Sequence, residues 1–265
     1  MVAMEQRLFH PALCLVLLLI GCGPGPSRQV DDLPQVQICA ANFTETDPAL
    51  DWSGPRPSSN PVHGIDISTW QGRIDWPTAQ ANGVNFAFMK ATEGGDRVDP
   101  AFATNWANAA AAGVPRGAYH FFYNCGPADQ QARWFIDNVP RSAAALPPVL
   151  DMEWTPRSPT CPGKRPAEQV RADARRFLTL VQSHYGRRPI LYTTLDFFKE
   201  NQMWTLTGVD FWLRSTSAHP SESYPGQHWT FWQYSGTGAV PGVAGKVDLN
   251  VFAGSRTDWA RWLAL

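Results

Sequence analysis

Two carboxyl groups stand two residues apart at the end of a predicted buried strand, where residues 148–152 run into Glu153 and Trp154. Because side chains alternate along a strand, Asp151 and Glu153 point to one face while Met152 points to the other. Neighbouring acids raise the pKa of at least one of them, and a Glu that stays protonated near neutral pH can donate a proton to a glycosidic oxygen. The same triplet also fits solvated or salt-bridged acids, so it decides nothing by itself.

Further acids lie at or just beyond the ends of other predicted strands. Asp66 lies in one such strand end, Glu93 follows the strand that ends in Lys90, and Asp248 lies near the C-terminus. In a β/α barrel the working residues lie at the C-terminal ends of the strands. An inward position that carries Asp is costly unless water or a ligand reaches it, so several such acids predict an open acidic cleft. A cleft of this kind suits the cleavage of glycosidic bonds.

Short apolar runs alternate with amphipathic helices from His63 onward, which is typical of a mostly parallel α/β domain. The predicted strands are residues 64–67, 84–90, 116–122, 148–152, 189–193, 210–214 and 229–234. The predicted helices begin at Asp99, Pro127 and Pro166 and end near Gly113, Asn138 and Gly186. Toward the C-terminus the helices become sparse and aromatic strands dominate. We therefore expect an α/β fold, a TIM-like (β/α) barrel whose second half is irregular and mostly β.

The N-terminus carries a predicted export signal. An apolar run over residues 13–20 follows Arg7, is too short to span a bilayer and fits the core of a signal peptide. The run leads into Leu19-Ile20-Gly21-Cys22, which resembles a bacterial lipobox. We predict that residues 1–21 are a signal peptide and that Cys22 carries a lipid, so that the protein is exported and membrane-anchored, facing the periplasm or the cell surface. The alternative is a plain secretory signal with an incidental Cys.

The segment after Cys22 differs in composition from the rest of the chain. Residues 23 to about 60 are rich in Pro, Gly, Ser and Asp and lack a sustained apolar period. Such a composition suits a tether, so we expect residues 22–60 to be a lipidated, flexible tether with little regular structure. Residues 61–265 then form the predicted catalytic domain, and a monomer is the default expectation.

Export into an oxidising compartment makes the remaining cysteines candidates for disulfides. Cys125 and Cys161 each follow a predicted core strand by a few residues, which places both on the same face of the domain, so we pair them and leave Cys39 unpaired. The sequence has no closely spaced pair among these cysteines and no His-x-x-x-His pattern, so we predict no metal site and no cofactor. The net charge of −1, the pI near 6.6 and the lack of a basic cluster argue against binding to nucleic acid.

Seven segments, in order along the chain, resemble the glycoside hydrolase family 25 lysozymes, bacterial and phage muramidases that hydrolyse the β-1,4 bond between N-acetylmuramic acid and N-acetylglucosamine in peptidoglycan. The resemblance spans roughly residues 62 to 253. The more specific segments are DISTWQG at residues 66–72 and FMKATEG at residues 88–94. The others are residues 117–121, 151–153, 191–193, 232–235 and 247–250.

The resemblance implies roles for particular residues. Glu153 is expected to be the general acid, and the acidic cluster is completed by Asp66, Asp151 and Asp248. The residues expected to line the sugar groove are Tyr119, Tyr192, Trp212, Gln233 and Glu93. The aromatic residues among them also fit the barrel core, and Trp212 can serve only to pack the barrel.

The chain departs from the family pattern in one loop. Arg97 stands where the family usually has an aromatic residue or Leu, whereas Asp99 is retained. The departure bears on the shape of this loop and on one substrate contact, not on the catalytic acids. Glu93 ranks below the other four acids, because it can hold this loop through backbone hydrogen bonds rather than take part in the chemistry.

The spacing of Asp151 and Glu153 bears on the mechanism. Two carboxylates on one strand end leave no room for the water that an inverting enzyme places between them, so we predict retention. Either an aspartate attacks the anomeric carbon, or the N-acetyl oxygen of the substrate does so while Asp151 steadies the positive charge. We favour the second of these.

Two other functions compete with a muramidase. A chitinase-like barrel hydrolase also ends a strand in Asp-x-Glu, but it adds an Asp two residues earlier, where this chain has Val149. A catalytically weak, lipid-tethered wall-binding protein has no need for so many unpaired carboxylates in one cleft. We therefore expect the glycan strands of peptidoglycan as substrate and the membrane as a partner through the anchor at Cys22.

Overall fold

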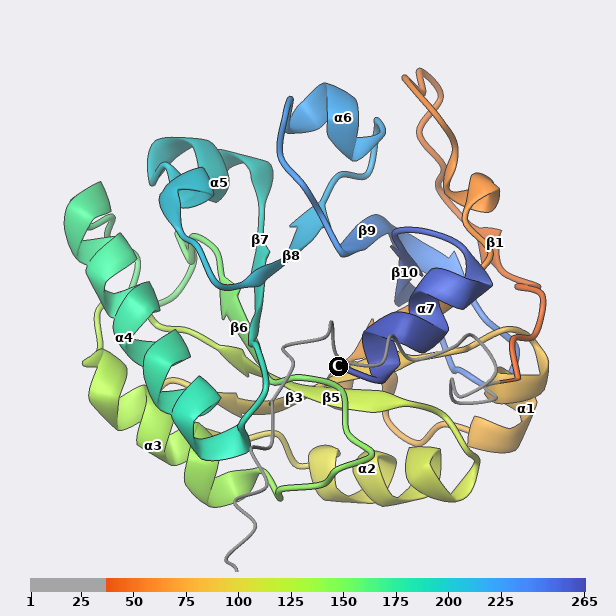
Figure 1. Cartoon of the computed structure of the whole chain (residues 1–265), viewed down its shortest axis with the longest axis horizontal. Helices are drawn as coiled ribbons and strands as arrows, with labels where there is room; N and C mark the ends of the chain where they lie inside the picture. Colours follow the sequence, from red (N-terminus) through yellow and green to blue (C-terminus); the bar gives the residue numbers. More distant parts are fainter. Residues whose placement is uncertain (1–36) are drawn as a thin grey trace, which may run out of the picture. The chain divides into compact units, whose positions relative to one another are not determined.

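Eight strands close into a barrel within residues 37–265, the part of the chain that the computed structural model describes (Figure 1). Seven of the barrel strands run parallel, whereas β10 is antiparallel to both of its neighbours, β9 and β2, and the two-residue strand β4 (Arg97–Val98) pairs antiparallel with β3 outside this order. In order around the barrel they are β2 (His63–Ile67), β3 (Ala87–Glu93), β5 (Arg116–Phe121), β6 (Val149–Met152), β7 (Ile190–Thr193), β8 (Asp210–Arg214), β9 (Phe231–Ala239) and β10 (Val247–Phe252). The predicted α/β barrel is confirmed. The predicted signal peptide and the lipidation site at Cys22 lie outside the described residues.

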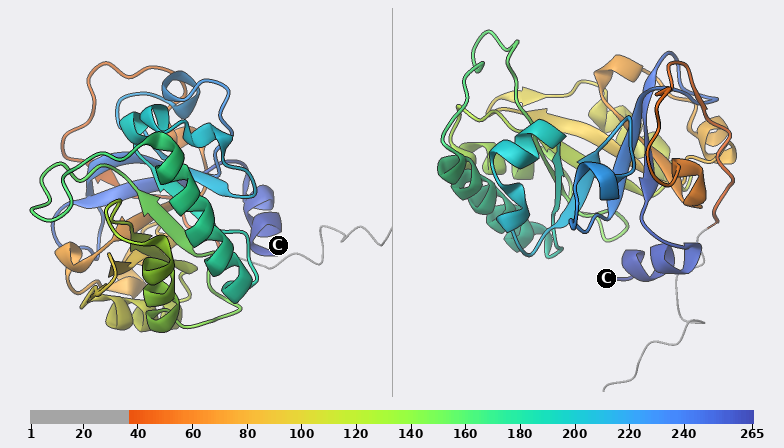
Figure 2. Two further views of the ribbon diagram at one scale, coloured as in Figure 1. Left: turned by 90° about the vertical axis from the view of Figure 1, so that its left-hand side faces the viewer. Right: turned by 90° about the horizontal axis from the view of Figure 1, so that it is seen from above.

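The helices cover the outside of the barrel unevenly (Figures 1 and 2). Three long helices, α2 (Phe102–Ala111), α3 (Ala128–Asn138) and α4 (Ala167–Tyr185), pack on the first half close to where the sequence predicts them. The second half has only the short helices α5 (Leu195–Glu200) and α6 (Pro220–Ser223) between its strands, which confirms its predicted irregularity. The sequence did not predict α1 (Trp76–Ala81), α7 (Arg256–Leu263) or the strand β10. No helix within residues 37–265 combines the length and the apolar character needed to cross a bilayer.

One apolar stripe holds the longest helix, α4, against the barrel. Val170, Ala174, Phe177 and Val181 recur every three to four residues and are all buried, as the helical period requires. The helix ends at Gly186, whose φ of 70° lies in the left-handed region that glycine adopts at little cost.

The inside of the barrel consists of two layers. In the lower layer, inward side chains of successive strands are large and apolar, and the rings of Phe88 and Trp212 pack with centroids 4.7 Å apart. Phe231 contacts Phe88 from the side, and Trp259 of α7 packs on Phe231. Because side chains alternate along a strand, the next inward residue lies two positions further on, nearer the carboxyl end. There the same strands carry charged and polar residues.

Residues 37–60 lie against the barrel. The two-residue strand β1 (Thr44–Glu45) pairs with β9, and Trp52 packs on Trp232 with ring centroids 5.6 Å apart. The sequence predicts a flexible tether up to residue 60, whereas residues 37–60 have little regular structure but pack on the barrel. The segment is polar in composition, but a few of its apolar side chains, among them Phe43, pack on the barrel core.

A disulfide joins Cys125 to Cys161, with their Cα atoms 5.7 Å apart, and confirms the predicted pairing. Cys125 lies in the loop after β5 and Cys161 in the loop after β6, so the bond ties together two neighbouring loops at the carboxyl ends of the strands. Cys39 forms no disulfide with any other described residue.

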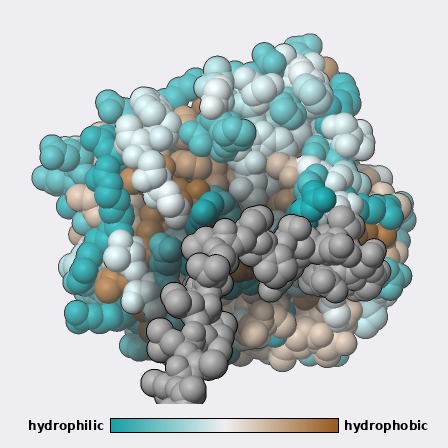
Figure 3. All heavy atoms as spheres, in the orientation of Figure 1, coloured by the Kyte–Doolittle hydropathy of each residue, from teal (hydrophilic) through white to brown (hydrophobic). Residues whose placement is uncertain are grey.

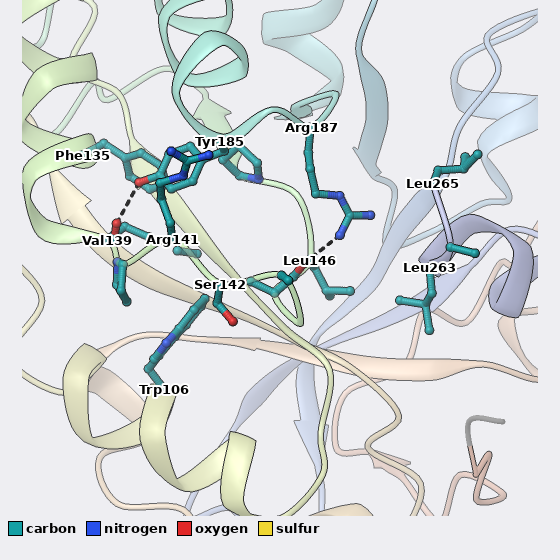
Figure 4. A pocket seen from close by; sticks show the side chains of 16 residues that line it. Trp106, Phe135, Val139, Arg141, Ser142, Leu146, Tyr185, Arg187, Leu263 and Leu265 are labelled. Carbon is teal, nitrogen blue, oxygen red and sulfur yellow. Dashed lines mark hydrogen bonds between the residues drawn. The ribbon is translucent and has the colours of Figure 1, made fainter. Parts of the chain in front are cut away.

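A cavity of about 490 Å³ lies at the opposite end of the barrel (Figure 4). Its lining includes Leu146, which leads into β6, Arg187, which leads into β7, and Leu265 at the end of the chain. None of the predicted site residues lines it.

On the face seen in Figure 3, hydrophobic residues show in a hollow edged by hydrophilic ones.

Candidate active site

The four predicted catalytic acids lie together above the aromatic layer, at the end of the barrel where the parallel strands end and the antiparallel β10 begins. Asp66 on β2 lies opposite Asp248 on β10 in the strand register. Asp151 is the third residue of β6, and Glu153 stands one residue past the end of that strand. Each of the other three acids raises the pKa of Asp151 through its charge, so all four share one electrostatic environment.

Two amide side chains hold Asp66 in place. Its Oδ2 accepts hydrogen bonds from Nε2 of Gln233 at 2.9 Å and from Nδ2 of Asn250 at 2.7 Å. Burial raises the pKa of Asp66 to about 6, although these two hydrogen bonds and the charge of Arg214 act in the opposite direction. Asp66 is therefore mostly ionised at neutral pH.

Asp248 is the proton-bearing partner of Asp66. Burial is the largest cause that raises the pKa of Asp248 to about 8, and the charge of Asp66 adds to it, while Arg214 lowers it. The interaction of the two carboxyl groups raises the pKa of Asp248 and lowers that of Asp66, so Asp248 is the member of the pair that holds the proton. At neutral pH the pair thus holds one proton between two carboxyl groups.

Asp151 and Glu153 form the second pair of acids. Asp151 is only 7% exposed, and its Oδ1 has no hydrogen-bond partner among the described residues. Burial, followed by the charge of Glu153, raises the pKa of Asp151 well above its ordinary value. Glu153 is half-buried, and burial raises its pKa to about 7 against the opposing charge of Arg214. A carboxyl group that titrates near 7 can both donate and take back a proton at neutral pH.

The aromatic residues predicted to line the groove lie deeper than expected. Tyr192 donates its hydroxyl to Oε1 of Gln233 at 2.9 Å, and Trp212 donates Nε1 to Oδ1 of Asn250 at 2.8 Å. These two bonds orient the amides that hold Asp66. Trp212 is 2% exposed and packs in the lower layer, so its position supports the acids from below and does not line an open groove. The end of a strand predicts an inward side chain but not its depth.

Tyr119 and Gln233 also differ in exposure from groove residues. Both are buried, Tyr119 on β5 and Gln233 on β9. Burial and the charges of Asp66, Asp151 and Asp248 raise the pKa of Tyr119 well above its ordinary value. Its hydroxyl therefore stays protonated at neutral pH.

Glu93 has three side-chain partners, one on β3 itself, one in the segment that follows β3 and one in the loop after β5. It pairs with Lys90, accepts a hydrogen bond from the hydroxyl of Tyr123, and lies 3.7 Å from Nη1 of Arg97. Burial tends to raise the pKa of Glu93, but these partners together keep it below its ordinary value. Glu93 thus holds its loop through side-chain pairs rather than backbone hydrogen bonds, and Arg97, the departure from the family pattern, is one of the residues that it holds.

Sequence reasoning missed two residues at this end of the barrel. Arg214 ends β8, is exposed, and lowers the pKa of three of the four acids through its charge. The alternation of β8 places Arg214 inward with Trp212, a signal that the sequence contained. Trp70 is 88% exposed on the turn that directly follows β2, so a flat apolar face stands beside the strand that carries Asp66.

Polar contacts and charge, rather than metal ligands, dominate this site. Across residues 37–265, no group of three or more His, Cys, Asp or Glu side chains is arranged to hold a metal ion. The arrangement offers a carboxyl group that titrates near neutral pH, a buried acid beside it, and an acid pair that shares a proton. Acid catalysis on a polar substrate is the chemistry that such groups can perform.

Known proteins share this arrangement of strands. Residues 65–243 match the family described as Glycosyl hydrolases family 25. Lysozyme M1 of Streptomyces globisporus is 39% identical over 228 residues, which cover 80% of this chain and 73% of that lysozyme.

Solved structures agree with the sequence comparison. A family 25 glycosyl hydrolase from Bacillus anthracis superposes with a TM-score of 0.71 at 35% identity, covering 79% of this chain and 96% of that one. The bacterial lysozyme from Streptomyces coelicolor superposes with a TM-score of 0.67 at 39% identity, covering 77% and 96% of the two chains. The chain therefore belongs to glycosyl hydrolases family 25 and is a glycoside hydrolase.

Proposed function

We propose that this protein is a muramidase that hydrolyses the β-1,4 bond between N-acetylmuramic acid and N-acetylglucosamine in peptidoglycan. The observation that carries the proposal is the half-buried Glu153, whose pKa of about 7 leaves a proton available beside three further acids. Relatives named lysozyme and N,O-diacetylmuramidase support the substrate class. Family membership and Val149 in place of a further Asp argue against the chitinase-like alternative.

Glu153 is the proposed general acid and base. It protonates the leaving glycosidic oxygen while the N-acetyl oxygen of the substrate attacks the anomeric carbon from the other side. Glu153 then removes a proton from water, which opens the resulting ring and restores the original configuration at that carbon. The two steps use one carboxyl group whose pKa lies near the working pH, as such a dual role requires.

Asp151 is the proposed partner of the attacking acetamido group. Its unpartnered Oδ1 is buried in the described structure and is free to accept the N–H of that group, which also steadies the developing positive charge. Asp66, held by Gln233 and Asn250, supplies a fixed negative charge to the same region. A sugar found covalently bound to Asp66, Asp151 or Asp248 contradicts this mechanism.

Product analysis tests the proposed activity. Purified protein and its Glu153→Gln variant are incubated with peptidoglycan, and the released fragments are identified by mass spectrometry. We expect fragments that end in reducing N-acetylmuramic acid from the wild type and none from the variant. Fragments that end in reducing N-acetylglucosamine, or cleavage of chitin oligomers alone, overturn the bond assignment. Wall binding by both proteins without any release favours the wall-binding alternative.

We also propose that the protein is exported and held at a membrane by a lipid on Cys22, and that it acts as a monomer. The lipobox-like sequence before Cys22 supports the anchor. Expression of the full chain and of its Cys22→Ala variant, followed by cell fractionation, tests it. We expect the wild type in the membrane fraction and the variant in the soluble exported fraction. Light scattering of the soluble variant gives the oligomeric state.

A further inference from the structure

The main chain at Glu153 lies outside the barrel ladder. The strand β6 ends at Met152, and the last hydrogen bond that ties it to the neighbouring segment on the β5 side is Phe122 N to Asp151 O, at 2.9 Å. One residue beyond, the carbonyl oxygen of Glu153 accepts a hydrogen bond from Nδ2 of Asn124 at 3.1 Å. The side chain of Asn124, from the loop after β5, thus replaces the main-chain hydrogen bond that the sheet does not provide at Glu153.

Asn124 is itself held from two directions. Its main-chain oxygen accepts a hydrogen bond from Nη1 of Arg165 at 2.9 Å, and Arg165 pairs with Asp173 on α4. The next residue, Cys125, forms the disulfide with Cys161, and its main-chain N–H points at the Cys161 sulfur at 3.1 Å. The loops after β5 and β6 are therefore joined both by a covalent bond and by hydrogen bonds.

A hydrogen bond within the loop after β6 joins two of its residues near Glu153. The hydroxyl of Thr155 donates to the main-chain oxygen of Cys161 at 2.7 Å, so the disulfide is tied back to a position two residues after the acid. The disulfide is thus linked by hydrogen bonds to Thr155 directly and to Glu153 through Asn124, its neighbour in the chain.

The other end of the Asn124 amide has no partner. Asn124 is buried, and its Oδ1 meets no hydrogen-bond donor in the described part of the chain. An unpaired buried polar atom lowers stability, so an asparagine here is a poor choice for folding alone. Its Nδ2 makes one useful bond, and that bond leads to the main chain of Glu153.

We propose that Asn124 is a positioning residue that fixes the main chain of Glu153, and that the Cys125–Cys161 disulfide keeps Asn124 in place. The proposal rests on the role of Glu153 in the proposed function. Proton transfer depends steeply on the placement of the acid relative to the glycosidic oxygen, and displacements of about 1 Å cost up to about a hundredfold in rate. The loop pair therefore acts on catalysis without touching the substrate.

A matched pair of asparagines allows a sharp test. Asn201 is also buried, donates Nδ2 to a main-chain oxygen, that of Phe197, at 3.0 Å, and accepts from Nη1 of Arg171 at 2.9 Å. Asn124→Ala and Asn201→Ala thus remove equivalent bonds. We expect Asn124→Ala to lower kcat about ten- to a hundredfold with KM changed less than twofold, and Asn201→Ala to leave kcat unchanged at a similar loss of Tm. Equal kcat in the two folded variants overturns the proposal.

The pH dependence separates positioning from general loss of structure. Asn124→Ala lets water reach Glu153, so the alkaline limb of kcat/KM should move to lower pH. Asn124→Asp keeps the shape, removes the donor and adds a negative charge near the acid, so the same limb should move to higher pH. If the alkaline limb of kcat/KM lies at the wild-type pH in both variants, that result contradicts a positioning role. If Asn124→Ala does not fold, the isosteric Asn124→Asp carries the test.

The disulfide is tested separately. The double variant Cys125→Ser/Cys161→Ser should lower kcat in the same direction as Asn124→Ala while near-UV circular dichroism shows an intact fold, and unchanged kcat overturns the role of the disulfide. The pKa of the Glu153 side chain, followed by NMR in each variant, gives a readout that needs no turnover. If the wild type releases no glycan, the proposed function fails, whereas a Glu153 pKa that differs between Asn124→Ala and Asn201→Ala still supports the positioning role.

Discussion

The lower and upper layers of the barrel interior come from the same strands and differ in what they contribute. Two positions apart on β8, Trp212 packs the aromatic layer and Arg214 reaches the acidic layer. On β6 the same step leads from buried Val149 to Asp151. The lower layer gains from burial, because apolar surface leaves water. In the upper layer burial disfavours the charged form of the acids, and it is the largest cause that raises the pKa of each of them.

One barrel thus serves both stability and catalysis, through different layers of its interior. The aromatic layer fills the barrel below the acids, and burial raises the pKa of Glu153 to about 7. Burial of the aromatic side chains in the lower layer stabilises the fold and offsets the free-energy cost of burying the acids in the upper layer. We expect changes in the upper layer to affect activity far more than stability, and changes in the lower layer to do the reverse.

The largest expected effect is on activity, from Glu153→Gln. Glutamine keeps the size of the side chain but cannot donate the proton, so kcat should fall on the order of a thousandfold, which corresponds to about 4 kcal/mol. The Tm should stay within a few degrees of the wild-type value, since a carboxyl in an unfavourable setting is removed. The exposed Glu168, at the start of α4, provides the control Glu168→Gln, which should change neither quantity. Activity retained in Glu153→Gln contradicts the division between the layers.

The matching change in the lower layer is Phe231→Ala. Phe231 is fully buried against Phe88 and Trp259, so its removal should cost about 3 kcal/mol of unfolding free energy, measured by urea denaturation. The folded fraction should keep kcat within a fewfold of the wild type. A kcat loss comparable to that of Glu153→Gln, in protein shown to be folded, breaks the comparison.

The acids make stability depend on pH, and the sign follows from their shifts. The folded-state pKa values of Asp66, Glu153 and Asp248, about 6, 7 and 8, lie above the ordinary values of 3.8 to 4.5. Groups of this kind bind protons more tightly in the folded protein, so their contribution is fully present below about pH 4 and is lost as the pH rises to about 8. We expect the unfolding free energy to fall across this window through these groups.

Asp248→Asn sharpens this expectation. The asparagine can still donate to Asp66 but cannot lose a proton, so the fall in stability between about pH 6 and 8 should become shallower while kcat at pH 6 stays within about tenfold. Thermal unfolding across pH measures the slope. Asp137→Asn, on the exposed side of α3, is the control and should leave the slope unchanged. A slope identical to wild type in Asp248→Asn contradicts the raised pKa of Asp248.

Sequence reasoning found the acids because alternation along strands is a strong signal. The two-residue period places Asp151 and Glu153 on one face of their strand, whereas their expected roles rest on the resemblance to family 25. The long helices follow from their apolar stripes. Depth in the barrel was not predictable, so Trp212 was placed in the groove although it packs below it. The strand β10 was missed because its antiparallel pairing interrupts the βα pattern that identifies the other strands.

Other features needed the assembled fold. Residues 37–60 read as a tether, since their polar composition outweighs the few side chains that contact the barrel. The alternation of β8 predicts that Arg214 points inward, but a charged residue at a strand end is normally solvated, and its closeness to the acids depends on the closure of β8 onto β9. Contacts between distant segments, rather than local patterns, decide both cases.

The smallest expected effect lies at the rim, outside both layers. Trp70 is 88% exposed on the turn after β2 and makes no side-chain hydrogen bond within the described chain. A flat indole face in this position suits stacking on a sugar ring, so Trp70→Ala should raise KM for long glycan strands about threefold, with kcat and Tm unchanged. Trp204→Ala, also at an exposed aromatic residue, is the control and should leave KM unchanged. A kcat loss in Trp70→Ala places this residue with the acids, whereas equal KM in both variants means that substrate contacts end at the upper layer.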